Sequence, residues 1–236
     1  MCVPFITDNY RTLFIPEHSG YYINDHTIFQ DAYGNWQLIG ITSKTDGNPD
    51  AEKYFAVASS KTFPPNDIMK EESPVADVGE LAWAPHVIKH KNIYHMFWSP
   101  HKLHHMTSTN GIRWGNHDVI MEKPYHKFFR DCMILQVAKD QWLLYTTARG
   151  TFFSQIDVYQ SFNLTQWQYI RTALQSSWGS ERNSPALITT LKAHAPEWIY
   201  VPQTKQWYIT TCGWKWVATL TNGEAAIAPV SWKCKK

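Results

Sequence analysis

Short runs of β-branched and aromatic residues, separated by turn residues, dominate the hydrophobic pattern of this 236-residue chain. The clearest case is the stretch 21–42, where two such runs flank an Asp, Gly and Asn turn at residues 31–35 and predict a β-hairpin. No stretch sustains an apolar period of 3.6 residues, so we expect helix to be minor. Residues 1–20 contain Pro4, Pro16 and Gly20 as breakers and are expected to be irregular. The pattern predicts an all-β protein.

The same arrangement of short strands recurs in blade-like units at about residues 21–60, 81–118, 128–170 and 194–232. Each unit has a polar landmark, an apolar strand, a short turn and an aromatic-led strand; the landmarks are Asp25, His86, Asp131 and Glu197. The two middle units add a strand, a turn containing Ser and Asn, and a Trp. Such self-similarity, at roughly 45–60 residues, is typical of a β-propeller, and we expect residues 1–236 to form a single propeller domain.

Net charge and aromatic content limit the kinds of binding partner that we expect. The formal net charge is only +2 and no long basic run is present, so neither nucleic acid nor an anionic membrane is expected as a partner. No run approaches the roughly 18 apolar residues of a membrane span. Aromatic residues make up 15% of the chain, and the 12 Trp and 12 Tyr suit stacking on sugar rings; the alternative is that strands simply favour aromatics.

The four cysteines show no CxxC pair and no metal-ligand spacing, and Cys132 and Cys212 are expected to be buried thiols within strands. Residues 1–20 carry charges and no apolar core of a signal peptide. We therefore expect a cytoplasmic protein, or a secreted one if a leader has been removed.

Asp25 is the first candidate for chemistry, because it lies between two apolar runs and burying a carboxylate is costly without a purpose. Its alternative role is a turn carboxylate that accepts backbone N–H groups. The histidines at 101–105 are expected in a loop, at the surface or a pocket rim rather than in a zinc site, because no carboxylate or Cys is adjacent. Arg149 and His126 are further rim candidates.

Four motifs, Asn24-Asp25-His26, Trp83-Ala84-Pro85, Arg130-Asp131 and Ser184-Pro185, occur in the order found in a known group. Over residues 21–232 the chain resembles the five-bladed β-propeller glycosidases, the group of glycoside hydrolase families 32, 43 and 68 that contains arabinanases, β-xylosidases, invertases and levansucrases. The resemblance implies that Asp25 acts as base or nucleophile and that Asp131 orients substrate and tunes the acid. The group often keeps an ion or a water at the propeller axis; no other cofactor is implied.

The chain departs from the group in two ways. The general acid of the group is a Glu two residues before a Pro, and here Asn183 has that position. Glu181, two residues upstream and so on the same face of a strand, is the candidate acid, and its alternative is a solvated loop residue. Second, the remnant 181–193 is too short for a blade, so one blade is abbreviated or missing. The ring could close as four blades, stay gapped or borrow a strand from a second copy.

The sequence therefore predicts a glycoside hydrolase that cleaves a furanoside or a xyloside/fructoside-type bond with paired carboxylates in an axial pocket. The expected catalytic residues are Asp25, Asp131 and Glu181. The expected substrate-binding residues are Asn24, His26, Trp83, His86, Arg130, His194 and Glu197. Core or strand-end roles are the alternatives for Trp83 and Glu197, and a structural ion pair is the alternative for Arg130 and Asp131.

The rival function is a catalytically inactive or weak propeller that binds carbohydrate and has lost its general acid. The expected partner is an oligosaccharide or glycoside. The histidines His26, His86 and His194 lack the spacing of a metal site, so no metal ligands are assigned. An incomplete ring would expose strand edges, which favours pairing between chains and a homo-oligomer.

Overall fold

The computed structural model describes residues 2–44, 49–72, 78–126, 128–149, 154–175, 194–212 and 224–234. Their regular structure is strands, apart from one short 3₁₀ turn at Pro49–Ala51. The chain divides into two compact units: unit 1 comprises Met1–Asp77 and Ala186–Lys236, and unit 2 comprises Val78–Pro185. Within the described ranges, no helix is long and apolar enough to span a membrane.

The first sheet of unit 1 has its strands in sequence order, each antiparallel to the next: β3 (Tyr21–Gln30), β4 (Trp36–Lys44), β5 (Tyr54–Ser60) and β6 (Lys70–Glu72). The predicted hairpin is confirmed, since β3 pairs with β4 from Tyr21 opposite Lys44 to Gln30 opposite Trp36. Asp31 holds its turn: Oδ1 accepts the backbone N–H groups of Tyr33 at 2.8 Å and Asn35 at 2.9 Å.

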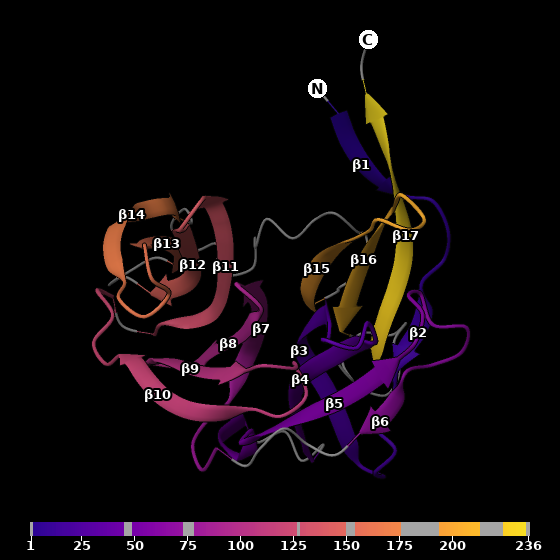
Figure 1. Cartoon of the computed structure of the whole chain (residues 1–236), viewed down its shortest axis with the longest axis horizontal. Coiled ribbons are helices and arrows are strands. Elements are labelled where there is room, and N and C mark those ends of the chain that lie inside the picture. The colour runs from indigo at the N-terminus through magenta and orange to yellow at the C-terminus, as the bar shows by residue number, and fades with distance from the viewer. Residues whose placement is uncertain are drawn as a thin grey trace. The chain divides into compact units, whose positions relative to one another are not determined.

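Unit 2 contains two further four-stranded sheets of the same up-and-down topology. Their strands are β7 (Trp83–His90), β8 (Ile93–Ser99), β9 (Leu103–Ser108), β10 (Gly115–Met121), β11 (Arg130–Ala138), β12 (Gln141–Arg149), β13 (Ser154–Ser161) and β14 (Gln168–Gln175). Antiparallel sheets of four sequential strands are the blades of a propeller. Figure 1 shows the labelled strands of each sheet side by side.

The same turn joins the third and fourth strands of both sheets in unit 2. In one, Ser108 Oγ accepts the N–H of Gly111 at 2.8 Å; in the other, Ser161 Oγ accepts the N–H of Leu164 at 2.9 Å. Gly111 and Leu164 both have positive φ, at 78° and 66°. The predicted repeat of Ser- and Asn-containing turns is thus confirmed.

The last sheet, in unit 1, is completed by the N-terminal residues. Its path is β1-β17-β16-β15, with β2 also paired to β17; the strands are β1 (Cys2–Ile6), β2 (Arg11–Phe14), β15 (His194–Val201), β16 (Gln206–Cys212) and β17 (Ala225–Cys234). The expectation that residues 1–20 are irregular is therefore wrong. Pro4 is tolerated because β1 pairs only along β17 and is an edge strand.

A disulfide between Cys2 and Cys234 links β1 to β17. Figure 1 shows this two-stranded ribbon extending beyond the rest of its sheet, with both chain ends at its tip. Cys132 is a free, buried thiol as predicted, and burial raises its pKa. Cys212 ends β16, and its side chain lies outside the described part of the structure.

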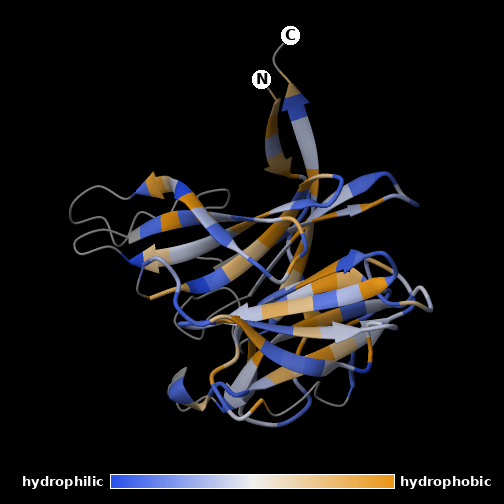
Figure 2. Ribbon diagram, turned by 60° about the vertical axis from the view of Figure 1, so that its left-hand side comes forward, coloured by the Kyte–Doolittle hydropathy of each residue, from blue (hydrophilic) through white to orange (hydrophobic). Residues whose placement is uncertain are grey.

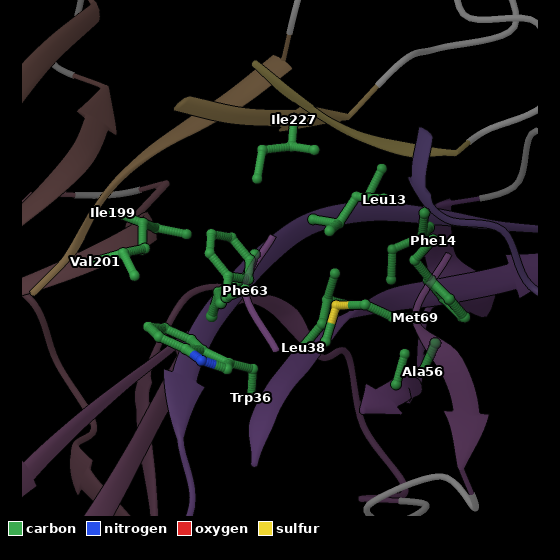
Figure 3. Close-up of a cluster of buried hydrophobic side chains, with 14 residues drawn as sticks. Leu13, Phe14, Trp36, Leu38, Ala56, Phe63, Met69, Ile199, Val201 and Ile227 are labelled. Carbon is green, nitrogen blue, oxygen red and sulfur yellow. The ribbon is translucent and has the colours of Figure 1, made fainter. Parts of the chain in front are cut away.

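Each unit has its own apolar core. In unit 1 the core joins the first sheet, β2 and the last sheet through fully buried residues such as Leu13, Leu38 and Ile227. Figure 3 shows Phe63 from a loop lying among these side chains, and its ring centroid is 4.7 Å from that of Trp36. In unit 2 the core includes Trp142 and Phe129. Apolar and polar positions alternate along many strands, as Figure 2 shows, because successive side chains point to opposite faces.

One apolar surface of unit 2 stands out. Met133, Leu135 and Val137 alternate along β11 and are 46%, 49% and 44% exposed. Alternate residues of a strand share a face, so β11 presents an apolar stripe there. Oligomerisation stays a prediction.

Candidate functional site

The pairing between the first and second strands shifts once near the start of the first strand in every described sheet. The shifts lie between Asn24 and His26, Trp83 and His86, Arg130 and Met133, and His194 and Glu197. A β-bulge leaves extra residues outside the ladder and redirects their side chains. Three of the four motifs singled out from the sequence therefore share one structural position, a bulge in the first strand of a sheet; the fourth, Ser184-Pro185, lies outside the described residues.

The backbone at these bulges is strained in three cases. Asp25, Ala84 and Asp131 have φ values of 32°, 47° and 57°, a left-handed region that non-glycine residues seldom adopt. Such a conformation costs about 1–3 kcal/mol and is enriched at functional sites. Two of the three predicted catalytic carboxylates thus occupy the same unusual backbone position, in two different sheets.

Gly40 makes room for the bulge at Asp25. It pairs with His26 across the β3–β4 ladder. A Cβ atom added to Gly40 would lie 2.5 Å from Ile23 Cδ1, 2.9 Å from His26 Cβ and 3.1 Å from the carbonyl oxygen of Asn24. Only a glycine lets β4 pass this close to the bulge, which explains a glycine inside a buried strand.

In unit 1, the residues beside Asp25 are buried. His26 is 6% exposed, and its Nε2 lies 2.9 Å from Thr210 Oγ1 on β16. Burial lowers the pKa of His26 to about 4, so the imidazole is neutral at pH 7. Asn24 is 7% exposed, and its Oδ1 has no hydrogen-bond partner among the described residues. Each side chain has a fixed number of donors and acceptors, so it can hydrogen-bond a ligand only through those that do not already bond the protein.

Glu197 is the second carboxyl group near this bulge. Its Oε1 accepts a hydrogen bond from Thr27 Oγ1 at 3.2 Å, whereas its buried Oε2 has no partner within the described ranges. Desolvation raises the pKa of Glu197 to about 8, against the smaller opposing effects of the hydrogen bonds from Thr27 and the backbone of Ile28. Glu197 is therefore mainly protonated at pH 7.

Two further predicted residues, His194 and Glu181, have side chains outside the described part of the structure. His194 opens β15 opposite Cys212, but its side chain lies outside the described part of the structure. Glu181 and the neighbouring motif with Asn183 also lie outside the described residues. Their roles stay predictions.

In unit 2, Asp131 is 35% exposed at its side chain and pairs with Arg130, whose Nε lies 3.4 Å from Asp131 Oδ2. The backbone N–H of Asp131 donates to the buried Ser99 Oγ at 3.1 Å. The carbonyl oxygen of Arg130 accepts from Thr146 Oγ1 at 2.6 Å. Groups from β8 and β12 therefore fix the bulge and leave its carboxylate partly open to solvent.

A hollow of about 450 Å³ lies beside this pair. Its lining residues are Trp83, Pro100, His101, Phe128, Phe129, Arg130, Thr147, Ala148 and Arg149. Trp83 and Arg130, both predicted to bind substrate, thus line one hollow, together with the rim candidate Arg149. An aromatic surface with guanidinium groups is suited to a polar ring-shaped ligand.

His86 makes a different contact. It is partly buried, and its Nε2 donates to the carbonyl oxygen of Ile134 at 3.1 Å. Desolvation lowers its pKa. This bond joins the first strands of the two sheets in unit 2. A role for His86 in substrate binding stays a prediction.

The expectation for the histidines at 101–105 is wrong in part. His101 does line the hollow, but His104 and His105 belong to strand β9 and are 2% and 4% exposed. They alternate between the two faces of a buried strand, so they are neither loop nor rim residues. A carboxylate, that of Glu80, also lies 3.6 Å from His104 Nδ1. His126, another rim candidate, instead pairs with the buried Asp157 at 2.7 Å.

The sequence did not identify Phe128 and Thr147 as candidates. Phe128 has a φ of 57° two residues before the Arg130-Asp131 motif, and Arg149 lies over its ring at 5.7 Å. Phe128 therefore presents an exposed aromatic surface beside the hollow. Proximity to the motif was the only available signal.

No protein-family model matches the sequence, and no curated protein sequence matches it. Solved structures do match. The GH32 β-fructofuranosidase of Bombyx mori has a TM-score of 0.55 and 13% identity over 82% of this chain, and a thermostable family-43 glycoside hydrolase has a TM-score of 0.55 and 17% identity over 86%. RS223 β-xylosidase has a TM-score of 0.54 and 9% identity over 97%.

The chain spans 43% of the length of the Bombyx mori chain, 67% of the family-43 chain and 96% of the β-xylosidase chain. At these identities the likeness concerns the fold. The chain has the all-β propeller fold of the family 32 and 43 glycosidases, with four blade-like sheets in its described part rather than five.

Proposed function

We propose that this protein is a glycoside hydrolase that cleaves a furanoside or a xyloside/fructoside-type bond. The observation that carries the proposal is the shared position of Asp25 and Asp131, each in a positive-φ bulge of the first strand of a sheet. The propeller fold of the matching glycosidases supports it.

Glycoside hydrolysis needs one carboxylate that activates water or attacks the sugar, and one carboxylic acid that protonates the leaving oxygen. Asp25 is the proposed base or nucleophile. Asp131 is the proposed orienting carboxylate, and the Arg130 guanidinium lies beside it. Trp83 would stack on a sugar ring, and Arg130 would hydrogen-bond its hydroxyl groups.

Two groups are candidates for the acid. Glu181 is the first candidate, because it lies near Ser184-Pro185 in the sequence. Glu197 is the second, since a carboxyl group with a pKa of about 8 carries the proton that an acid must donate. Because Glu197 Oε2 is buried, its use as an acid requires that substrate binding expose it. Comparing Glu181→Gln with Glu197→Gln separates the two candidates.

A carbohydrate-binding propeller without hydrolase activity is the second candidate function. Asn183 stands where the related glycosidases have their acid, and an Asn cannot donate a proton in this way. The hollow with Trp83, Phe128 and Arg130 could still hold a sugar.

The test is hydrolysis of nitrophenyl arabinofuranoside, xyloside and fructoside by the whole chain, with isothermal titration of the corresponding free sugars. The proposal expects hydrolysis of at least one glycoside and its loss in Asp25→Asn. Sugar binding without hydrolysis, together with activity gained in Asn183→Glu, would establish the binding function instead. Hydrolysis unchanged in Asp25→Asn would remove Asp25 from the mechanism.

A further inference from the structure

Three potential metal ligands converge in unit 2. Glu80 lies just before β7, His104 lies in β9 and His117 lies in β10. One ligand atom from each lies within 4.8 Å of those of the other two. His104 Nδ1 is 3.1 Å from His117 Nε2 and 3.6 Å from Glu80 Oε1.

Two of the three separations suit a tetrahedral ion, and the third, between Glu80 and His117, lies within 4.8 Å. Zinc binds imidazole nitrogen and carboxylate oxygen at about 2.0–2.2 Å, which places neighbouring ligand atoms of a tetrahedron roughly 3.3 Å apart. The distances of 3.1 Å and 3.6 Å bracket that value. Two imidazoles and one carboxylate are also a donor set that zinc accepts, with water as the fourth ligand.

The surroundings hold the ligands in place. The His104 ring stacks on the fully buried Trp98, with centroids 5.1 Å apart, and the His117 ring lies against the same indole at 4.9 Å. His104 is 2% exposed, whereas Glu80 and His117 are exposed, so an ion could reach the site from solvent. Lys102 is the nearby cation, and Glu122 offsets its charge at 2.9 Å.

We propose that Glu80, His104 and His117 bind a divalent transition-metal ion, with zinc as the best fit. The site shares no residue with the hollow beside Asp131. A bound ion would tie the segment before β7 to β9 and β10, the third and fourth strands of its sheet, and so stabilise unit 2. The competing explanation is a hydrogen bond between the imidazoles of His104 and His117, with no ion.

The proposal is independent of the proposed enzyme activity, so it is tested by binding. Untagged, chelator-treated protein is titrated with zinc chloride by calorimetry, and its melting temperature is recorded with and without zinc. We expect one ion per chain and a higher melting temperature with zinc. His117→Ala and Glu80→Gln change exposed side chains, so they should fold and lose about tenfold or more in zinc affinity.

His18→Ala is the matched control, because His18 is an exposed histidine of unit 1, with 80% of its side chain accessible. It should bind zinc as the parent does. Absence of zinc binding by the parent would overturn the proposal. Equal affinity in His117→Ala and His18→Ala would also overturn it, because the zinc would then be bound elsewhere.

Discussion

His86 and Glu197 hold equivalent positions in two different sheets. Each directly follows an Ala-Pro pair in the bulge of the first strand of its sheet. Each also contacts the first strand of the neighbouring sheet, at the residue three positions after an Asp with positive φ. His86 donates to the carbonyl oxygen of Ile134, and Glu197 accepts from the backbone of Ile28. The position joins neighbouring first strands in both units, with donor and acceptor exchanged.

Because Glu197 is protonated in the folded protein, we expect the free energy of unfolding to decrease as the pH rises. Burial raises the folded pKa from 4.5 to about 8, so between these pH values the unfolded chain ionises Glu197 while the folded chain keeps the proton. The stability contributed by this group is present below about pH 4.5 and is lost as the pH rises towards 8. Glu197→Gln should lack this loss, with a difference from the parent of up to about 1.4 kcal/mol per pH unit.

Urea unfolding at pH 5, 6, 7 and 8 measures the Glu197 effect. Glu17→Gln is the control, because Glu17 is an exposed carboxylate of the same unit. Parallel pH profiles for the parent and Glu197→Gln would show that Glu197 is ionised in the folded protein.

The buried His26 should make the protein less stable as the pH falls. Burial lowers the pKa of His26 in the folded protein from 6.5 to about 4. Between these pH values His26 is protonated in the unfolded chain but stays neutral in the folded protein, so the free energy of unfolding decreases as the pH falls. His26→Gln keeps an amide that can bond Thr210 and should show a shallower decline from pH 6.5 to 4. Thermal unfolding across that range measures the difference, with the exposed His18→Gln as control. An equal decline in His26→Gln and the parent would contradict the assignment.

Gly40→Ala tests the packing behind the Asp25 bulge. The added Cβ would meet Ile23 at 2.5 Å and His26 at 2.9 Å, so neighbouring strands must move. We expect a loss of about 1–3 kcal/mol in the free energy of unfolding. Gly115→Ala is the matched control, since a Cβ there meets nothing within 4 Å. Equal stability of the two variants would mean that the strands do not approach as closely as described.

The Cys2–Cys234 disulfide should stabilise the last sheet, because it closes a loop across a sequence separation of 232 residues. Chain-entropy reasoning sets an upper value of roughly 5 kcal/mol for the loss in Cys2→Ser. Non-reducing peptide mapping should find the linked terminal peptides, and urea unfolding measures the loss. Finding both thiols free in protein purified without reductant would contradict the pairing.

The sequence predicted the elements whose signals are local. The hairpin of β3 and β4 follows from alternation and from the Asp31 turn, whose hydrogen bonds span only a few residues. The repeated turns at Ser108 and Ser161 follow from similar short motifs. Asp25 stood out as a carboxylate between two apolar runs, and Asp131 stood out as the polar landmark of its unit and through the Arg-Asp motif of the glycosidases that the chain resembles.

Features that depend on distant residues could not be predicted. Strands β1 and β2 are stable only because β17, from the other end of the chain, pairs with them. Glu80 approaches His104 through the fold, since no carboxylate is adjacent in sequence. The bulges likewise depend on the partner strand, as Gly40 shows for Asp25.

The most direct measurement of the central claim compares three aspartates with positive φ. Asp25 and Asp131 lie in bulges, whereas Asp140, with a φ of 53°, lies at the turn after β11 and pairs with Lys91 at 3.1 Å. Asn tolerates this backbone conformation, so Asp→Asn changes the charge with little added strain. We predict that kcat/KM for the best aryl glycoside falls about 10³-fold or more in Asp25→Asn and about 10²-fold in Asp131→Asn, and that Asp140→Asn matches the parent. Parent-like kcat/KM in both Asp25→Asn and Asp131→Asn would contradict the account.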